Sequence, residues 1–167
     1  MPKRGVILAS MALGLIWGLV LLRLGAGLRL PLPPSMALAL AGFPAGLILI
    51  VMVGRLAQRR FFDDASIDGA AFAPGGAAAI DQSVLTNTVE QIALALTIWP
   101  FAAYVLGPGV VLALALNFAV ARLLFWAGYH LSPPLRGFGF AATFYPTGLA
   151  ALWILWRLLG GAFPLPF

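Results

Sequence analysis

The sequence predicts an all-α fold, an integral membrane bundle of five transmembrane helices that forms a single domain over residues 1–167. Of the 167 residues, 62% are hydrophobic and 9% are charged, against about 25% charged in an ordinary globular domain. Lipid solvates apolar outer faces, whereas a soluble domain could not cover itself with so few charged groups. Five apolar stretches are long enough, or nearly so, to cross about 30 Å of hydrocarbon.

The first apolar stretch, residues 5–22, follows Lys3 and Arg4 and has the outline of a secretory signal. It is longer than the apolar core of a usual signal peptide, and the residues at 25–27 make a poor cleavage site. We therefore expect a retained membrane span at the N-terminus.

Four further apolar stretches follow, separated by links that contain proline, glycine or basic residues. We expect these spans at residues 36–54, 81–106, 109–130 and 137–156. The proline-rich link before the second span offers Ser35 as a helix N-cap. The Gly-Pro-Gly sequence at 107–109 predicts a tight turn, so the third and fourth spans must be antiparallel neighbours. Pro146 is expected to kink the fifth span.

The long loop at residues 61–80 and the basic residues define the expected orientation. Cytoplasmic loops carry an excess of lysine and arginine. With the N-terminus in the cytoplasm, Lys3, Arg4, Arg55, Arg59, Arg60 and Arg136 lie on that side, against Arg23, Arg29 and Arg157 on the other. This distribution favours a cytoplasmic N-terminus and a cytoplasmic loop. Long loops in compact proteins tend to be functional or mobile.

The remaining composition excludes several classes of protein. The net charge of +5 is explained by topology signals beside membrane spans, so we expect no nucleic-acid binding. The chain has no cysteine, and its single histidine, His130, cannot form a metal site alone. We expect His130 to be an interfacial polar residue. The abundance of alanine, leucine, glycine, proline and arginine favours a GC-rich bacterial genome, and hence a bacterial inner membrane.

Two charged residues, Glu90 and Arg122, fall inside predicted spans. Charges within spans are costly and therefore mark candidate functional sites. Under the expected topology each residue lies about eight positions, or about 12 Å, from the same membrane face. We therefore expect Glu90 and Arg122 to pair between neighbouring helices.

Other polar residues extend this pair into a predicted pocket between helices near the cytoplasmic face. The pocket residues are Arg55, Arg59, Ser83, Asn87, Glu90, Thr97, Arg122, Tyr129 and Arg136. A pocket rich in guanidinium suits a small anionic ligand, because arginine matches carboxylates bidentately. A Glu–Arg pair can also lock helix packing or belong to an ion or proton pathway, and the residues alone leave these three roles open.

Three short motifs follow one another along the last three predicted spans. They are the Asn-Thr-Val-Glu segment at 87–90, the segment 121–129 with Arg122 and Tyr129, and Pro-Leu-Arg at 134–136. In order, spacing and context they resemble the membrane-associated proteins in eicosanoid and glutathione metabolism (MAPEG). That family includes microsomal glutathione transferases and microsomal prostaglandin E synthase. The resemblance extends over roughly residues 45–158.

The resemblance implies a four-helix core at residues 36–158, preceded by an extra helix at residues 5–30. It implies a homotrimer that holds glutathione at subunit interfaces and acts on lipophilic substrates as a glutathione-dependent transferase or peroxidase. Position by position, the glutathione-pocket residues would be Arg55, Asn87, Glu90, Arg122 and Tyr129. Arg136 would match the arginine that stabilises the glutathione thiolate, since a nearby guanidinium favours the charged form of a thiol.

Ser83 departs from the family pattern, because glutathione-using members usually carry an arginine at this position. One guanidinium group that could bind a carboxylate is therefore missing. The alternative function is a non-catalytic scaffold, or an accessory subunit of a larger membrane complex, that retains the MAPEG fold. The extra N-terminal helix would give such a scaffold a further contact surface.

Overall fold

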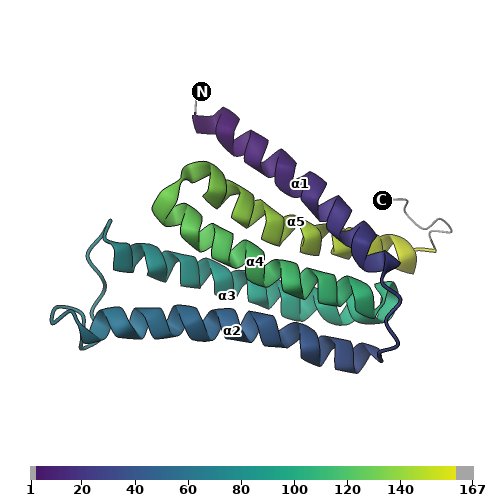
Figure 1. The fold of residues 1–167 in the computed structure, drawn as a ribbon, viewed down its shortest axis with the longest axis horizontal. Helices are drawn as coiled ribbons and strands as arrows, with labels where there is room; N and C mark the ends of the chain where they lie inside the picture. The colour runs from purple at the N-terminus through teal and green to yellow at the C-terminus, as the bar shows by residue number, and fades with distance from the viewer. Residues whose placement is uncertain (1–2, 161–167) are drawn as a thin grey trace.

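The computed structural model describes residues 3–160 and is a bundle of five long helices (Figure 1). The helices are α1 (Lys3–Gly27), α2 (Pro34–Phe61), α3 (Ala77–Phe101), α4 (Pro108–Leu131) and α5 (Pro133–Leu158), and no strand occurs among the described residues. All five helices, α3 with its extension to Leu106, are long and apolar enough to cross a membrane. The predicted all-α membrane bundle is confirmed, and the chain is an integral, multi-pass membrane protein.

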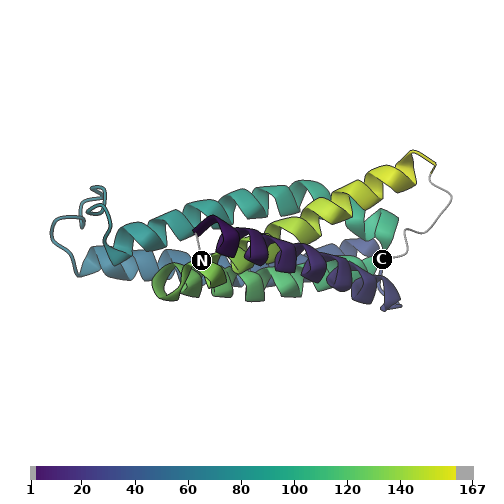
Figure 2. The ribbon, with the colours of Figure 1, turned by 90° about the horizontal axis from the view of Figure 1, so that it is seen from above.

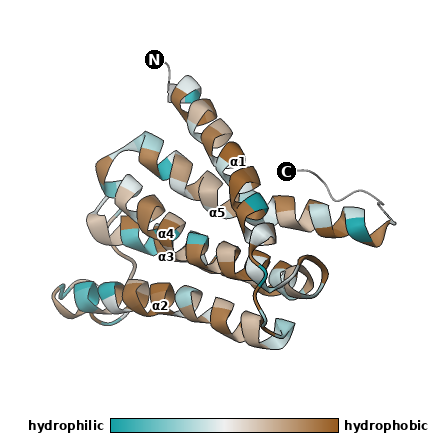
Figure 3. Cartoon of the chain, turned by 45° about the vertical axis from the view of Figure 1, so that its right-hand side comes forward, coloured by the Kyte–Doolittle hydropathy of each residue, from teal (hydrophilic) through white to brown (hydrophobic). Residues whose placement is uncertain are grey.

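The helices run lengthwise in an elongated bundle (Figures 1 and 2). The loop between α2 and α3, the start of α1 and the turn between α4 and α5 lie toward one end, which we call the loop end. Figure 3 shows apolar residues along all five helices and hydrophilic residues at the loop end of α2. This distribution suits helices whose middle sections face lipid.

The helices extend beyond the predicted spans because polar and basic residues continue them. α2 includes Arg55, Arg59 and Arg60, and basic side chains near a helix C-terminus interact favourably with its dipole. The expected loop at 61–80 therefore shortens to residues 62–76. The Ser35 cap is wrong: Pro33 occupies the N-cap position without a side-chain hydrogen bond, and Pro34 begins the helix. Proline suits the first helical position because its missing N–H would have no partner there.

A tight turn joins α3 to α4, as the sequence predicts. α3 continues into a π-helical turn, η1 (Ala102–Leu106), and Gly107 follows with a φ of 105°. Side chains strongly disfavour this backbone region, so glycine is required. Pro108 then starts α4 at once, and the two helices run antiparallel, side by side (Figure 1).

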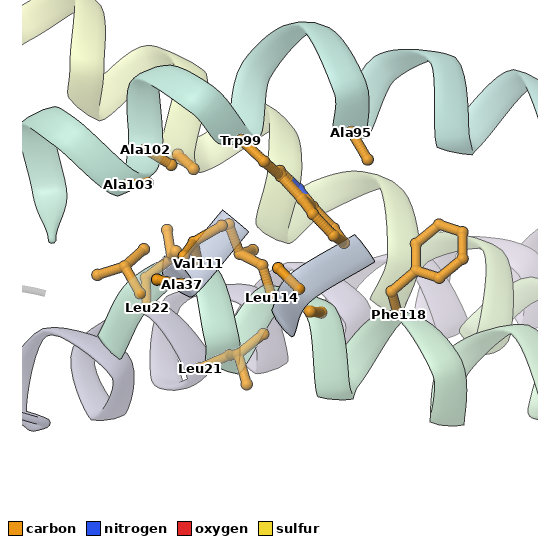
Figure 4. Close-up of a cluster of buried hydrophobic side chains, with 14 of the residues drawn as sticks. Leu21, Leu22, Ala37, Ala95, Trp99, Ala102, Ala103, Val111, Leu114 and Phe118 are labelled. Carbon is orange, nitrogen blue, oxygen red and sulfur yellow. The ribbon is translucent and has the colours of Figure 1, made fainter. Parts of the chain in front are cut away.

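α4 occupies the centre of the bundle and contacts the other four helices. Its buried Val111, Leu114 and Phe118 pack into the main hydrophobic cluster with Trp99 of α3 (Figure 4). The Trp99 and Phe118 rings meet edge to face, with centroids 5.9 Å apart. Small buried alanines let the helix backbones approach closely, as is usual in membrane bundles.

α1 lies across α4 and α5, on the side of the bundle away from α2 (Figure 1). Glycines make this contact close: a Cβ at Gly14 would overlap Ala141, and one at Gly18 would lie 3.3 Å from the backbone nitrogen of Pro146. Gly42 and Gly46 have a similar spacing, but nothing lies within 4 Å of a Cβ built at either position. The helix that precedes the expected four-helix core is therefore firmly packed against it.

Candidate functional site

Arg122 is fully buried in α4 and connects three helices. Its Nε donates to Oγ1 of Thr143 in α5 at 3.1 Å, and its Nη1 donates to Oδ1 of Asn87 in α3 at 2.9 Å. Its guanidinium carbon lies 4.2 Å from the centroid of the Phe125 ring. A charged group inside a membrane bundle requires such partners, because lipid and apolar side chains do not solvate it.

The expected ion pair between Glu90 and Arg122 is wrong in its geometry. No ion pair joins the two residues in the described part of the chain; instead, Asn87 donates from Nδ2 to Oε2 of Glu90 at 3.1 Å. The buried face of α3 is formed by Val84, Thr88, Gln91 and Ala95. At about 100° per residue, Glu90 points about 120° or more away from that face, and its side chain is exposed.

A cavity of about 430 Å³ lies beside this network at the loop end, and we call it the Tyr129 cavity. Its polar lining comes from Asn87, Tyr129 and Arg136. The Arg136 guanidinium lies over the Tyr129 ring, 4.9 Å from its centroid. The apolar lining residues are Ile7, Met11, Phe125, Pro133, Gly137 and Phe140.

The Tyr129 cavity has a positive character that fits an anionic ligand. Arg136 lines the cavity, and Arg122 lies behind two lining residues, Asn87 and Phe125. The Nη2 atom of Arg122 is buried and has no hydrogen-bond partner among the described residues. A buried donor without a partner costs roughly 1–3 kcal/mol, so this guanidinium retains hydrogen-bonding capacity. The predicted residues Asn87, Arg122, Tyr129 and Arg136 are therefore brought together.

Arg55 lies apart from these residues, in a second cavity of about 520 Å³ between α2, α3 and α4. We call it the Asp81 cavity; its polar lining is Arg55, Arg59, Asp81, Trp126 and His130. Trp126 and His130 project from a different face of α4 than Phe125 and Tyr129, which line the first cavity. The fold of this chain therefore does not bring Arg55 to the Tyr129 cavity.

Asp81 is a polar centre that the sequence analysis missed. It is only 3% exposed and accepts hydrogen bonds from Nε of Arg59 at 2.5 Å, Nε1 of Trp126 at 2.6 Å and Nε2 of His130 at 2.8 Å. His130, expected to be only an interfacial polar residue, thus joins α4 to α3. The available signal was the four-residue spacing of Trp126 and His130, which places both on one helical face. The described residues contain no group of three or more potential metal-ligating residues.

Ser83 lines neither cavity and is exposed. Its hydroxyl donates to the carbonyl oxygen of Ala79 in its own helix at 3.0 Å. It therefore does not replace the arginine that the family pattern carries at this position.

Comparison with known proteins identifies the family of the chain. A family model described as the MAPEG family matches residues 35–156, from the first turn of α2 almost to the end of α5. No curated protein sequence and no solved structure gives a match. The match covers most of the chain and leaves α1 outside it. The chain therefore belongs to the MAPEG family, the membrane proteins associated with glutathione and eicosanoid metabolism.

Proposed function

We propose that the chain is a glutathione-dependent transferase or peroxidase that acts on lipophilic substrates at the Tyr129 cavity. The observation that carries this proposal is the joint presence of Arg136, Tyr129 and Asn87 in one cavity, with Arg122 buried behind it. Guanidinium groups match carboxylates, and they favour the ionised form of a nearby thiol. Glutathione carries both groups, and its thiol is the nucleophile that this cysteine-free chain lacks.

Each polar residue has a distinct role in this proposal. Arg136 stabilises a thiolate, and the Tyr129 ring beneath its guanidinium restricts the orientation of that side chain. Asn87 and Arg122 form a hydrogen-bonded pair that receives a carboxylate, and Thr143 holds the Arg122 side chain in place. Such positioned donors contribute to catalysis because they need no reorganisation during the reaction.

Exposed polar residues on α3 support a homotrimeric assembly. Ser83, Thr86, Glu90 and Thr97 lie on one helical face and are exposed in the protomer. A carboxylate facing lipid within a span is costly, so another subunit is expected to cover this face. An assembly of this kind also gives a route by which Arg55 of a neighbouring protomer reaches the Tyr129 cavity.

The orientation of the protein follows from its basic residues. Arg55, Arg59 and Arg60 end α2, and Arg136 begins α5, all at the loop end. The positive-inside rule therefore assigns the loop end, the N-terminus and the Tyr129 cavity to the cytoplasmic side. The composition favours a bacterial inner membrane as the location. Cytosolic glutathione would then reach the cavity from water, while a lipophilic substrate enters from the bilayer.

Titration calorimetry of the detergent-purified protein with glutathione tests the proposal, together with conjugation of 1-chloro-2,4-dinitrobenzene and reduction of cumene hydroperoxide. We expect wild-type protein to bind glutathione and to catalyse at least one reaction. Arg136→Ala should lower catalysis by about 100-fold, in line with the loss of a charge-stabilising donor. Arg122→Ala should weaken binding. Arg157→Ala, at the other end of α5, is the matched control and should behave as wild type.

The absence of heat and of both activities in the wild-type protein would contradict the enzymatic function. The Ser83 hydroxyl, bonded within its own helix, then favours the alternative of a scaffold or an accessory subunit of a larger membrane complex. Stoichiometric recovery with an unrelated complex after pull-down in mild detergent would support that alternative, and an isolated homo-oligomer would oppose it.

A further inference from the structure

α1 lies outside the family match but contributes two side chains to the Tyr129 cavity. Ile7 and Met11 line this cavity together with Phe140 of α5 and Tyr129 of α4. Both α1 side chains are only partly covered, with exposed fractions of 41% and 36%. The four matched helices alone would leave this side of the cavity without these two apolar residues.

The position of α1 beside the cavity is fixed by close packing and by side-chain hydrogen bonds. Ser10, between Ile7 and Met11 in sequence, donates from Oγ to the carbonyl oxygen of Pro134 at 3.1 Å. A Cβ at Gly137, next to Arg136, would lie 3.1 Å from the Ser10 Cβ, so α1 contacts α5 directly beside that arginine.

A second hydrogen-bonded link holds α1 deeper in the bundle. Trp17 donates from Nε1 to Oδ1 of Asn117 in α4 at 2.7 Å, and Asn117 donates from Nδ2 to the carbonyl oxygen of Ala142 in α5 at 2.7 Å. The Gly14 contact with Ala141 lies between this link and Ser10. Ile7 and Met11 therefore belong to a supported wall of the cavity, not to a loosely attached helix.

The chemistry of the cavity divides into a polar part and an apolar part. Arg136, Tyr129 and Asn87 offer a guanidinium, a phenol and an amide, whereas Ile7, Met11, Phe125, Pro133 and Phe140 offer only apolar groups. An unbranched alkyl chain suits the apolar part, because methionine adapts to irregular shapes and burial of each CH₂ is favourable.

We propose that α1 forms the substrate wall of the Tyr129 cavity, with Ile7 and Met11 contacting the alkyl chain of a lipophilic substrate. This inference rests on the proposed function, in which Arg136, oriented by Tyr129, stabilises the thiolate of glutathione. It makes α1, the helix added to the family core, the element that determines which apolar substrates are accepted.

A thiol-protection experiment tests this inference on the full-length protein in nanodiscs. The chain contains no cysteine, so Ile7→Cys, Met11→Cys and Leu8→Cys each introduce a single thiol for alkylation by N-ethylmaleimide. Leu8 is 65% exposed and lines none of the described cavities, which makes it the matched control. The probes are S-methylglutathione and S-decylglutathione, which share one peptide and differ in alkyl length.

At ten times its Kd, S-decylglutathione should slow alkylation at positions 7 and 11 by about tenfold, as expected from mass action. S-methylglutathione should protect both positions much less, and neither probe should protect position 8. Met11→Ala should lower the ratio of S-decylglutathione to S-methylglutathione affinity about fivefold, in line with the loss of apolar contact. Leu8→Ala should leave this ratio unchanged.

The two hypotheses fail in different ways. If both probes bind but positions 7 and 11 are not protected and the affinity ratio is unchanged in Met11→Ala, the inference about α1 is wrong while the glutathione site stands. If neither probe produces heat in calorimetry, the glutathione site itself is wrong, and the substrate wall is wrong with it.

Discussion

Two buried charged side chains, Arg122 and Asp81, determine how the helices meet at the loop end. Arg122 joins α4 to α3 and α5, and Asp81 joins α3 to α2 and α4. A buried charge is tolerated only while its partners remain, and removal of one partner leaves the other uncompensated. The two residues differ in their surroundings, because Asp81 accepts three donors whereas Arg122 retains an unpaired nitrogen. We therefore infer a structural role for Asp81, whereas Arg122 is the buried charge to which the proposed function assigns a ligand.

Asp81→Asn tests the structural role of this carboxylate. The change preserves the shape of the side chain but removes the charge that Arg59 and His130 share. Because both side chains are partly exposed to solvent, we expect a loss of about 2 kcal/mol in unfolding free energy. The measurement is denaturant-induced unfolding in detergent micelles, followed by tryptophan fluorescence. Asp68→Asn, on the exposed loop, should have no effect, and equal stability of the two variants would exclude the structural role.

At the residue level, residue type and spacing were enough to predict which polar side chains lie near one another. Asn87, Tyr129 and Arg136 line one cavity, and Arg122, two turns from Tyr129 on the same helix, joins them through its hydrogen bond to Asn87. The direction of Glu90 depends on how α3 is rotated by the packing of Val84 and its neighbours, which no single-helix pattern specifies.

The α4–α5 pair is the element that shapes the Tyr129 cavity, and two glycines bring the helices together. A Cβ at Gly128 would lie 2.7 Å from the carbonyl carbon of Leu135 and closer still to the backbone of Arg136. A Cβ at Gly139 would lie 2.9 Å from the Phe125 Cβ. Both contacts fix residues of the cavity, because each places helix backbone directly against a lining residue.

Gly128→Ala should therefore destabilise the protein by about 2 kcal/mol, the usual range for overpacking. It should also weaken glutathione binding, since the backbone of Arg136 must shift. Gly148→Ala is the matched control, because nothing lies within 4 Å of a Cβ at that position. Alanine favours a helix by up to about 1 kcal/mol relative to glycine, so this control should be at least as stable as wild type in the same unfolding assay. A Gly128→Ala variant as stable as the control would show that the α4 and α5 backbones do not contact each other closely at this position.

At the scale of elements, the sequence was sufficient for the number, order and approximate position of all five helices. The length of each apolar stretch and the proline and glycine residues between the stretches specify the helices locally, as the Gly107 turn illustrates. Helix ends were less predictable. A cap at Ser35 would start the helix at Met36, but the helix starts two residues earlier, at Pro34, and basic residues extend α2 to Phe61. The role of α1 was not predictable, because Ile7 and Met11 become lining residues only through contacts with distant helices.

At the scale of the whole molecule, an exposed polar face on α3 supports the proposed assembly. Ser83, Thr86, Glu90 and Thr97 are exposed in one protomer, although they lie within a helix that can cross the membrane. The three hydroxyls donate within their own helix and Asn87 donates to Glu90, but a carboxylate that faces lipid within a span remains costly. The homotrimer proposed above would cover this face at its subunit contacts.

Native mass spectrometry in a mild detergent should therefore detect three copies of the 17.6 kDa chain. Thr86→Trp places a bulky group on the polar face of α3 and should shift the population toward single chains. Leu24→Trp, at an exposed apolar position of α1, should leave the trimer intact. A wild-type protein that is monomeric in every mild detergent would contradict the assembly.

A cryo-electron microscopy structure of the nanodisc-embedded protein at saturating glutathione would show directly whether the Tyr129 cavity holds the ligand. We expect ligand density in the Tyr129 cavity, with the sulfur nearest Arg136 and a carboxylate next to the Asn87–Arg122 pair. Ligand density confined to the Asp81 cavity, or no ligand density in either cavity at saturation, would contradict this expectation.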